Sequence, residues 1–169
     1  MKNRVNLLAV ILLGVGGAFG MAGTFMAQRN LQAAAWAIDG VALVVATTLI
    51  ALKYFRAGSD LTAAGFLVFA IGEGVMLVGT ATTLPESVPS FGAGTALWSA
   101  ALLLTSVSRD FAVWTRVVGI IGAILFAITA AGIFLGGHVL PTSSPLPFYA
   151  YPVLVLTFVG WIITLLKAE

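Results

Sequence analysis

The sequence predicts an all-α membrane protein, a single bundle of six transmembrane helices formed by residues 1–169 with both chain ends in the cytoplasm. Three observations predict this class. Of the 169 residues, 60% are hydrophobic and only 8% are charged, whereas a soluble domain carries about a quarter charged residues. The apolar runs are long enough to cross a bilayer, and none alternates with the period of two that is typical of barrel strands. Finally, the basic residues gather on one side of the expected membrane.

The first three spans follow from apolar runs of about 20 residues, the length that a helix needs to cross the hydrocarbon. The first span, about 5–26, follows the basic start MKNR and ends before AQRN. The second, about 31–52, ends before RAGSD, and the third, about 61–82, ends before LPESVPS. Backbone groups in lipid must be satisfied within the segment, so we expect all three to be helical.

The last three spans are bounded by similar polar stretches. The fourth, about 91–107, is the shortest, but FGAGTALWSAALLLTSV can still cross as a helix nearly perpendicular to the membrane. The fifth, about 112–135, follows SRD, and the sixth comprises about 148–166. A Pro-rich connector, GGHVLPTSSPLP, joins these two. It either covers the outer mouth of the bundle or, as we favour, simply leads the chain into the last span.

The basic residues indicate the orientation, because cytoplasmic loops of membrane proteins carry an excess of Lys and Arg. The loop that we place outside between the first two spans holds Arg29 alone. Seven basic residues lie on the other side: Lys2, Arg4, Lys53, Arg56, Arg109, Arg116 and Lys167. The pattern predicts a multi-pass protein of the cytoplasmic membrane. The first span also resembles a signal peptide, whose removal would leave five helices, but its apolar stretch is long for that role.

Two acidic residues lie inside spans, Asp39 in AAAWAIDGVAL and Glu73 in FAIGEGVML. A charge at the bilayer centre costs roughly 2.5–3.5 kcal/mol, so intramembrane acids are neutral, paired or exposed to water. Counted along the helices at about 1.5 Å per residue, both carboxyls lie roughly 12–14 Å below the outer ends of their spans. Antiparallel helices joined by a short loop are usually neighbours. We therefore expect the two side chains to share one layer of the bundle.

The helical faces around these acids supply the other candidate site residues. Trp36 shares a face with Asp39, and Phe69, Met76 and Thr80 share one with Glu73. No Lys or Arg lies at this depth, so at least one carboxyl is expected to be protonated at neutral pH unless a cation is bound. The pattern favours binding or transport of a small solute, cation or proton that enters from the outer face.

Small residues at spacing four predict close helix packing, because helices in lipid associate through small side chains. These faces favour packing within one bundle, although the same chemistry serves a homodimer or another membrane partner. The alternative function is therefore a non-catalytic accessory subunit with structural acids. The residues concerned are Gly16, Gly20, Gly119, Ala123, Ala127 and Ala131.

Other chemistries find little support in the sequence. Cysteine is absent and His138 is the single histidine, which disfavours thiolate, zinc and haem sites. Met21, Met26 and Met76 with His138 could suit copper, but their spacings fit no metal motif. No nucleophile motif or nucleotide-binding loop is present, and no basic cluster with interleaved aromatic residues suits nucleic acid. We therefore expect no metal, no cofactor and no nucleic-acid partner, and an enzyme is less expected than a binding protein.

Overall fold

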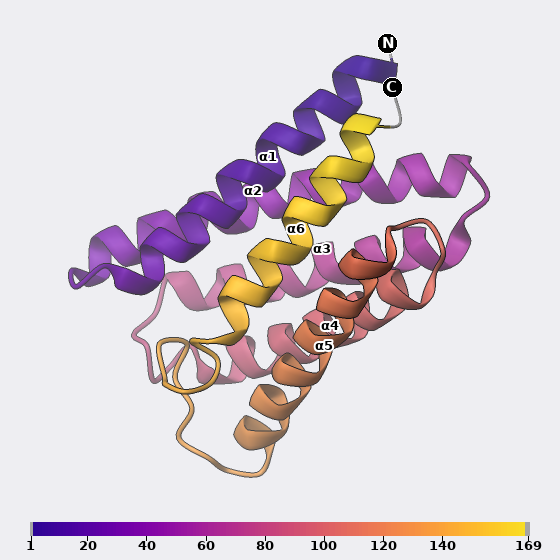
Figure 1. The fold of residues 1–169 in the computed structure, drawn as a ribbon. Helices are drawn as coiled ribbons and strands as arrows, with labels where there is room; N and C mark the ends of the chain where they lie inside the picture. The colour runs from indigo at the N-terminus through magenta and orange to yellow at the C-terminus, as the bar shows by residue number, and fades with distance from the viewer. Residues whose placement is uncertain (1, 168–169) are drawn as a thin grey trace.

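The computed structural model describes residues 2–167, without the side chains of residues 2 and 3 (Figure 1). Residues 1, 168 and 169 of the expected domain, and the Lys2 side chain that contributes to the charge pattern, lie outside the described residues. Within them there are six α-helices and no strand, and every helix is long and apolar enough to cross a membrane. The predicted all-α class is confirmed, and the described residues contain the predicted number of helices with the length and apolarity that a membrane crossing needs. The helices are α1 (Lys2–Phe25), α2 (Arg29–Arg56), α3 (Asp60–Thr80), α4 (Val88–Val107), α5 (Val113–Phe134) and α6 (Ala150–Lys167).

The helix α2 differs most from its expected span, because it continues to Arg56. Its last turn belongs to the protein interior: the Tyr54 ring is buried and stacks on Phe66, with ring centroids 5.9 Å apart. The helix ends where Gly58 adopts a φ of +76°, a conformation that other residues rarely take. Lys53 and Arg56 are therefore helical rather than part of a loop.

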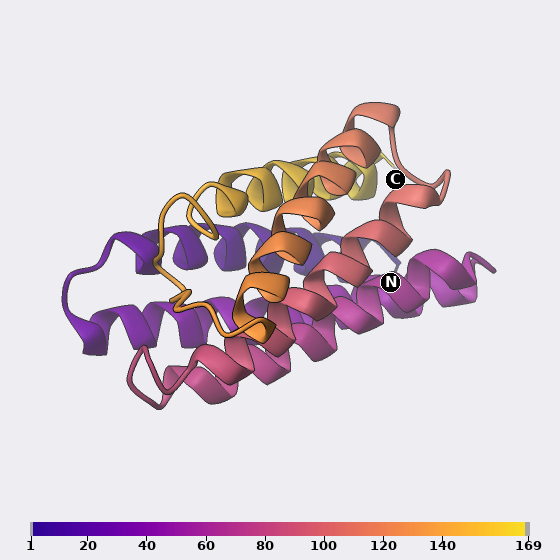
Figure 2. The same cartoon turned by 90° about the horizontal axis from the view of Figure 1, so that it is seen from below.

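The six helices form a ring in which each packs against the next in the chain and α6 returns to α1 (Figures 1 and 2). Both chain ends lie at the same end of the molecule, together with the α2–α3 and α4–α5 connections. The α1–α2, α3–α4 and α5–α6 connections lie at the opposite end, which we call the loop end. The outward faces are apolar, as expected for contact with lipid; Val78, for example, is 68% exposed.

Glycines allow the close approach of neighbouring helices. At the α3–α4 crossing, a methyl group on Gly72 would lie 3.3 Å from the carbonyl oxygen of Gly94, and one on Gly94 would lie 3.1 Å from the carbonyl oxygen of Gly72. Between α2 and α3, a methyl on Gly40 would lie 2.6 Å from Leu77. The α3 and α4 backbones therefore approach each other directly, and the Leu77 side chain fills the space that Gly40 leaves on α2, as small residues permit in membranes.

The small-residue faces predicted from the sequence are divided between interior and surface. Gly16 and Gly20 of α1 face α2, and Gly119 of α5 faces Ser106 of α4. Ala123 is buried, and its carbonyl oxygen accepts a hydrogen bond from Ser99 over 2.8 Å. Further along α5, Ala127 and Ala131 are exposed.

The interior of the ring near the chain ends is filled by buried aromatic rings, which we call the aromatic cluster. Phe66 and Trp161 have centroids 4.7 Å apart, and Trp98 and Phe126 are 5.1 Å apart. Such pairs contribute about 0.5–1.5 kcal/mol each beyond the area that they bury. The cluster separates the loop-end half of the interior from the chain ends. It comprises Tyr54, Phe66, Phe69, Trp98, Phe111, Phe126, Phe158 and Trp161.

Candidate functional site

The loop-end half of the ring contains a cavity of about 90 Å³ that is not fully enclosed. Five helices contribute to its wall: α1, α2, α3, α4 and α6, with Ser87 and Pro141 from the two connections above it. Three glycines of α1 leave room for it. A water molecule occupies roughly 30 Å³ in the liquid, so the cavity has room for a few waters or one small ligand. Asp39 and Glu73 both line it.

Asp39 projects from α2 toward the glycine face of α1. A methyl group on Gly20 would lie 2.7 Å from Asp39 Oδ2, and one on Gly16 would lie 3.3 Å from Oδ1. The carboxyl group therefore occupies space that any larger residue at position 20 would fill. The Oδ1 atom is buried and has no hydrogen-bond partner, although the residue as a whole is partly exposed.

Glu73 projects from α3 and is only 2% exposed. Its Oε1 atom is buried without a hydrogen-bond partner. The indole N–H of Trp98, on α4, lies close enough to interact with the carboxyl group, but its geometry falls short of a full hydrogen bond. Unpaired buried polar groups of this kind are rare in folded proteins and call for an explanation such as a ligand.

The two carboxyls lie within electrostatic range of each other, and the Tyr151 hydroxyl lies within range of both. Tyr151 donates a hydrogen bond to the carbonyl oxygen of Pro141 over 2.7 Å, which fixes its ring beside the cavity. Among the residues that the structure describes, no Lys, Arg or His lines the cavity. The site is therefore a mainly apolar chamber with two acids and no positive charge of its own.

Arg29 stabilises the rim near the cavity. Its guanidinium group donates hydrogen bonds to the carbonyl oxygens of Gly79, Thr80 and Thr82 at the C-terminal end of α3, the shortest being 2.6 Å to Thr82. A cation is favourable there because the helix macrodipole places negative charge at that end. The guanidinium also lies over the Trp36 ring, 5.8 Å from its centroid.

The α3–α4 connection beside this rim is held by Glu86, which is on the surface. Its carboxylate accepts hydrogen bonds from the Thr83 backbone N–H over 3.0 Å and from the Thr83 hydroxyl over 2.7 Å. These bonds stabilise the ionised form and lower the pKa of Glu86. Glu86 is an acid of the same type as Glu73 but outside the cavity, which makes it a useful control.

The structure brings together five of the six residues that the sequence singled out. Trp36, Asp39, Glu73, Met76 and Thr80 all line the cavity. Phe69 does not: it lies one turn deeper on α3, fully buried, and stacks on Trp98 with centroids 5.5 Å apart. It supports the cavity from the aromatic cluster.

Several lining residues were missed because they come from helices not adjacent to the acids in the chain. Trp98 of α4 and Tyr151 of α6 have no acidic residue in their own helices that would mark them. Gly20 was recognised as a packing residue, but its contact with Asp39 was not foreseen. The signal available in the sequence was an aromatic residue that can form a hydrogen bond in the outer half of each of these spans. Such a residue would have indicated a contribution to the cavity wall.

Comparison with models of known families, with curated proteins and with solved structures found no match to this chain. Its function therefore has to be argued from the site itself.

Proposed function

We propose that this chain is a multi-pass protein of the cytoplasmic membrane that binds a small solute, cation or proton in the cavity between α1, α2, α3, α4 and α6. One observation supports this most strongly. Glu73 is 2% exposed, its Oε1 atom has no hydrogen-bond partner, and it lines a cavity with a second acid, Asp39. A ligand that carries positive charge would satisfy both groups.

The physical argument is the cost of burying unpaired polar groups. A carboxyl group taken from water without a partner costs several kcal/mol if ionised and about 1–3 kcal/mol if neutral and unpaired. A purely structural pair of acids would be expected to bond to each other or to Ser and Thr hydroxyls. In the described residues, neither acid forms a hydrogen bond with such a hydroxyl, since Thr24, Thr80 and Ser90 donate to main-chain carbonyls. An acid left open in a cavity is better explained by binding.

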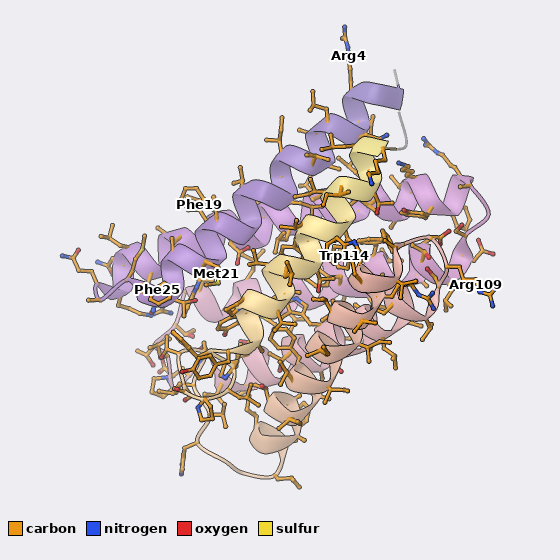
Figure 3. All side chains as sticks on the ribbon, viewed as in Figure 1. Arg4, Phe19, Met21, Phe25, Arg109 and Trp114 are labelled. Atoms are coloured by element: carbon orange, nitrogen blue, oxygen red, sulfur yellow. The ribbon has the colours of Figure 1, made fainter. Side chains whose placement is uncertain are left out.

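The proposed orientation places the loop end outside the cell. Arg4 and Arg109 lie at the end that holds the termini and the α2–α3 and α4–α5 connections (Figure 3). The positive-inside tendency favours this end as cytoplasmic. The cavity then faces outward, and the aromatic cluster lies between it and the cytoplasm. This arrangement supports binding from outside; transport would additionally require the cluster to open.

Intrinsic tryptophan fluorescence offers a direct test, because Trp36 and Trp98 line the cavity. The purified protein in detergent would be titrated with acid, with sodium chloride and with small ammonium salts at constant ionic strength. We expect at least one titration to change the fluorescence with saturation. Glu73→Gln should remove that change, whereas Glu86→Gln should retain it. A Glu73→Gln protein that titrates as the wild type would refute the proposal.

A role as an accessory subunit has one observation in its favour, the exposed small residues Ala127 and Ala131 of α5. These could approach a second copy or another membrane helix, whereas Gly16, Gly20, Gly119 and Ala123 are occupied within the chain. Analytical ultracentrifugation in detergent of wild type and Ala127→Leu would test self-association. A monomer in both cases would remove the support for a homodimer.

A further inference from the structure

The same cavity also indicates the class of ligand, an inference that rests on the proposed function. We propose that it binds a small monovalent ammonium cation that carries methyl or short alkyl groups. In this arrangement Asp39 and Glu73 face the positive charge, and the aromatic walls of the cavity contact the alkyl groups.

The charge of the ligand follows from the acids that face it. Two carboxyls share a cavity of about 90 Å³, and the structure shows no basic side chain in its wall. Two negative charges in so small a cavity repel, so we expect one carboxyl to keep its proton and the other to be ionised against the bound cation. A single positive charge then balances the site. The other titratable group that faces the acids is Tyr151, from α6.

The walls favour an organic cation over a simple ion. Aromatic rings attract ammonium groups through their negative faces, and cages of such rings bind methylated ammonium groups in proteins. The aromatic residues that line the cavity with the acids are Trp36, Phe91, Trp98, Tyr151 and Phe158.

Hard metal cations fit the wall less well, because they take oxygen ligands on most sides. The residues that meet the two acids are largely apolar: Gly16, Gly20 and Leu43 lie beside Asp39, and Trp98 lies beside Glu73. In the described part of the chain, no group of three or more His, Asp or Glu side chains could hold a metal ion.

The size of the cavity sets a limit on the ligand. The cavity of about 90 Å³ is not fully enclosed, so a compact cation can lie in it with part of its surface at the opening. Tetramethylammonium is therefore a suitable probe, and tert-butyl alcohol is a neutral molecule of similar shape. Sodium chloride supplies a simple cation for comparison.

Isothermal titration calorimetry of the full chain in detergent can separate these ligands. We expect saturable binding of tetramethylammonium chloride and none of tert-butyl alcohol or sodium chloride. Glu73→Gln and Asp39→Asn should each weaken tetramethylammonium binding at least about tenfold, because each removes a group that faces the charge. Glu86→Gln should bind as the wild type. Two cavity variants are used so that a folding defect in one leaves the test intact.

The contrary outcomes are distinguishable. If sodium or protons bind and tetramethylammonium does not, the ammonium proposal fails while the proposed function stands. If tetramethylammonium binds equally well to wild type and both cavity variants, it occupies another place and the ammonium proposal also fails. If none of the probes binds at any pH, both the ligand class and the proposed function are refuted.

Discussion

Gly20 of α1 is the position where a single methyl group would test the packing of the site most sharply. The structure places the Asp39 carboxyl group against the bare backbone there, so that a methyl on Gly20 would lie 2.7 Å from Oδ2 and 3.0 Å from Cγ. Both distances are too short for ordinary contact. In a Gly20→Ala protein, either Asp39 must rotate or α1 must move away from α2.

The change in unfolding free energy that Gly20→Ala causes is the difference of two opposing effects. Extra volume in a packed interior costs about 1–3 kcal/mol of unfolding free energy. The change from glycine to alanine within a helix returns up to about 1 kcal/mol. Gly14→Ala is the matched control on the same helix, because a methyl at Gly14 would meet nothing within 4 Å. We therefore expect Gly20→Ala to be less stable than Gly14→Ala by about 1–3 kcal/mol.

The assay is reversible unfolding in mixed micelles, followed by circular dichroism, for wild type and both variants. Gly17→Ala adds a second control, because its methyl would lie on the cavity wall at an ordinary 3.4 Å from Phe158. It should resemble Gly14→Ala in stability. Equal stability of Gly20→Ala and Gly14→Ala would refute the reasoning that Asp39 is held tightly against α1, because the carboxyl group could then turn away into the cavity at no cost.

Two further predictions concern the charged groups that hold helix ends. Arg29→Ala should lower the unfolding free energy by about 1–3 kcal/mol, because charged hydrogen bonds to the end of α3 are lost; exposed Arg4→Ala is the control, and equal stability of the two would contradict the capping role. Asp110 accepts hydrogen bonds from the hydroxyls of Ser59 and Thr62 at the start of α3 and from the hydroxyl of Ser108 at the end of α4. Asp110→Ala should therefore cost about 1–3 kcal/mol in the same unfolding assay, because these hydroxyls lose a charged acceptor, and a variant as stable as the wild type would show that the bonds are dispensable.

The helices were predictable because their signal is local. Apolar runs bounded by polar stretches indicate where a chain crosses a membrane, and the spans from sequence agree with α1 to α6 to within a few residues at most ends. The exception, the extension of α2 to Arg56, depends on Tyr54 packing against Phe66 of another helix. That contact has no trace in the local pattern.

The candidate site was predictable only where neighbouring helices form it. Counting residues from the ends of α2 and α3 placed Asp39 and Glu73 at one depth, and both line one cavity. The same counting grouped Phe69 with Glu73. Phe69 instead packs against Trp98 of α4 and Phe158 of α6, below the cavity, and these contacts between helices cannot be counted along one helix. Trp98 and Tyr151 reach the site through the closure of the ring, which helical periodicity does not encode.

The proposal that the acids lie in a cavity open to water outside the cell can be tested most directly by thiol labelling, because the chain contains no cysteine. Cysteine would replace Asp39 or Glu73, and in controls Val41 or Val78, which are 56% and 68% exposed on the outward face. Intact cells would be treated with a membrane-impermeant trimethylammonium methanethiosulfonate. We predict reaction at Asp39→Cys and Glu73→Cys and none at Val41→Cys and Val78→Cys, because thiols react as thiolates in water. If neither acid position reacted, or if all four cysteine variants were labelled equally, the result would contradict an outward-facing cavity that contains the two carboxyls.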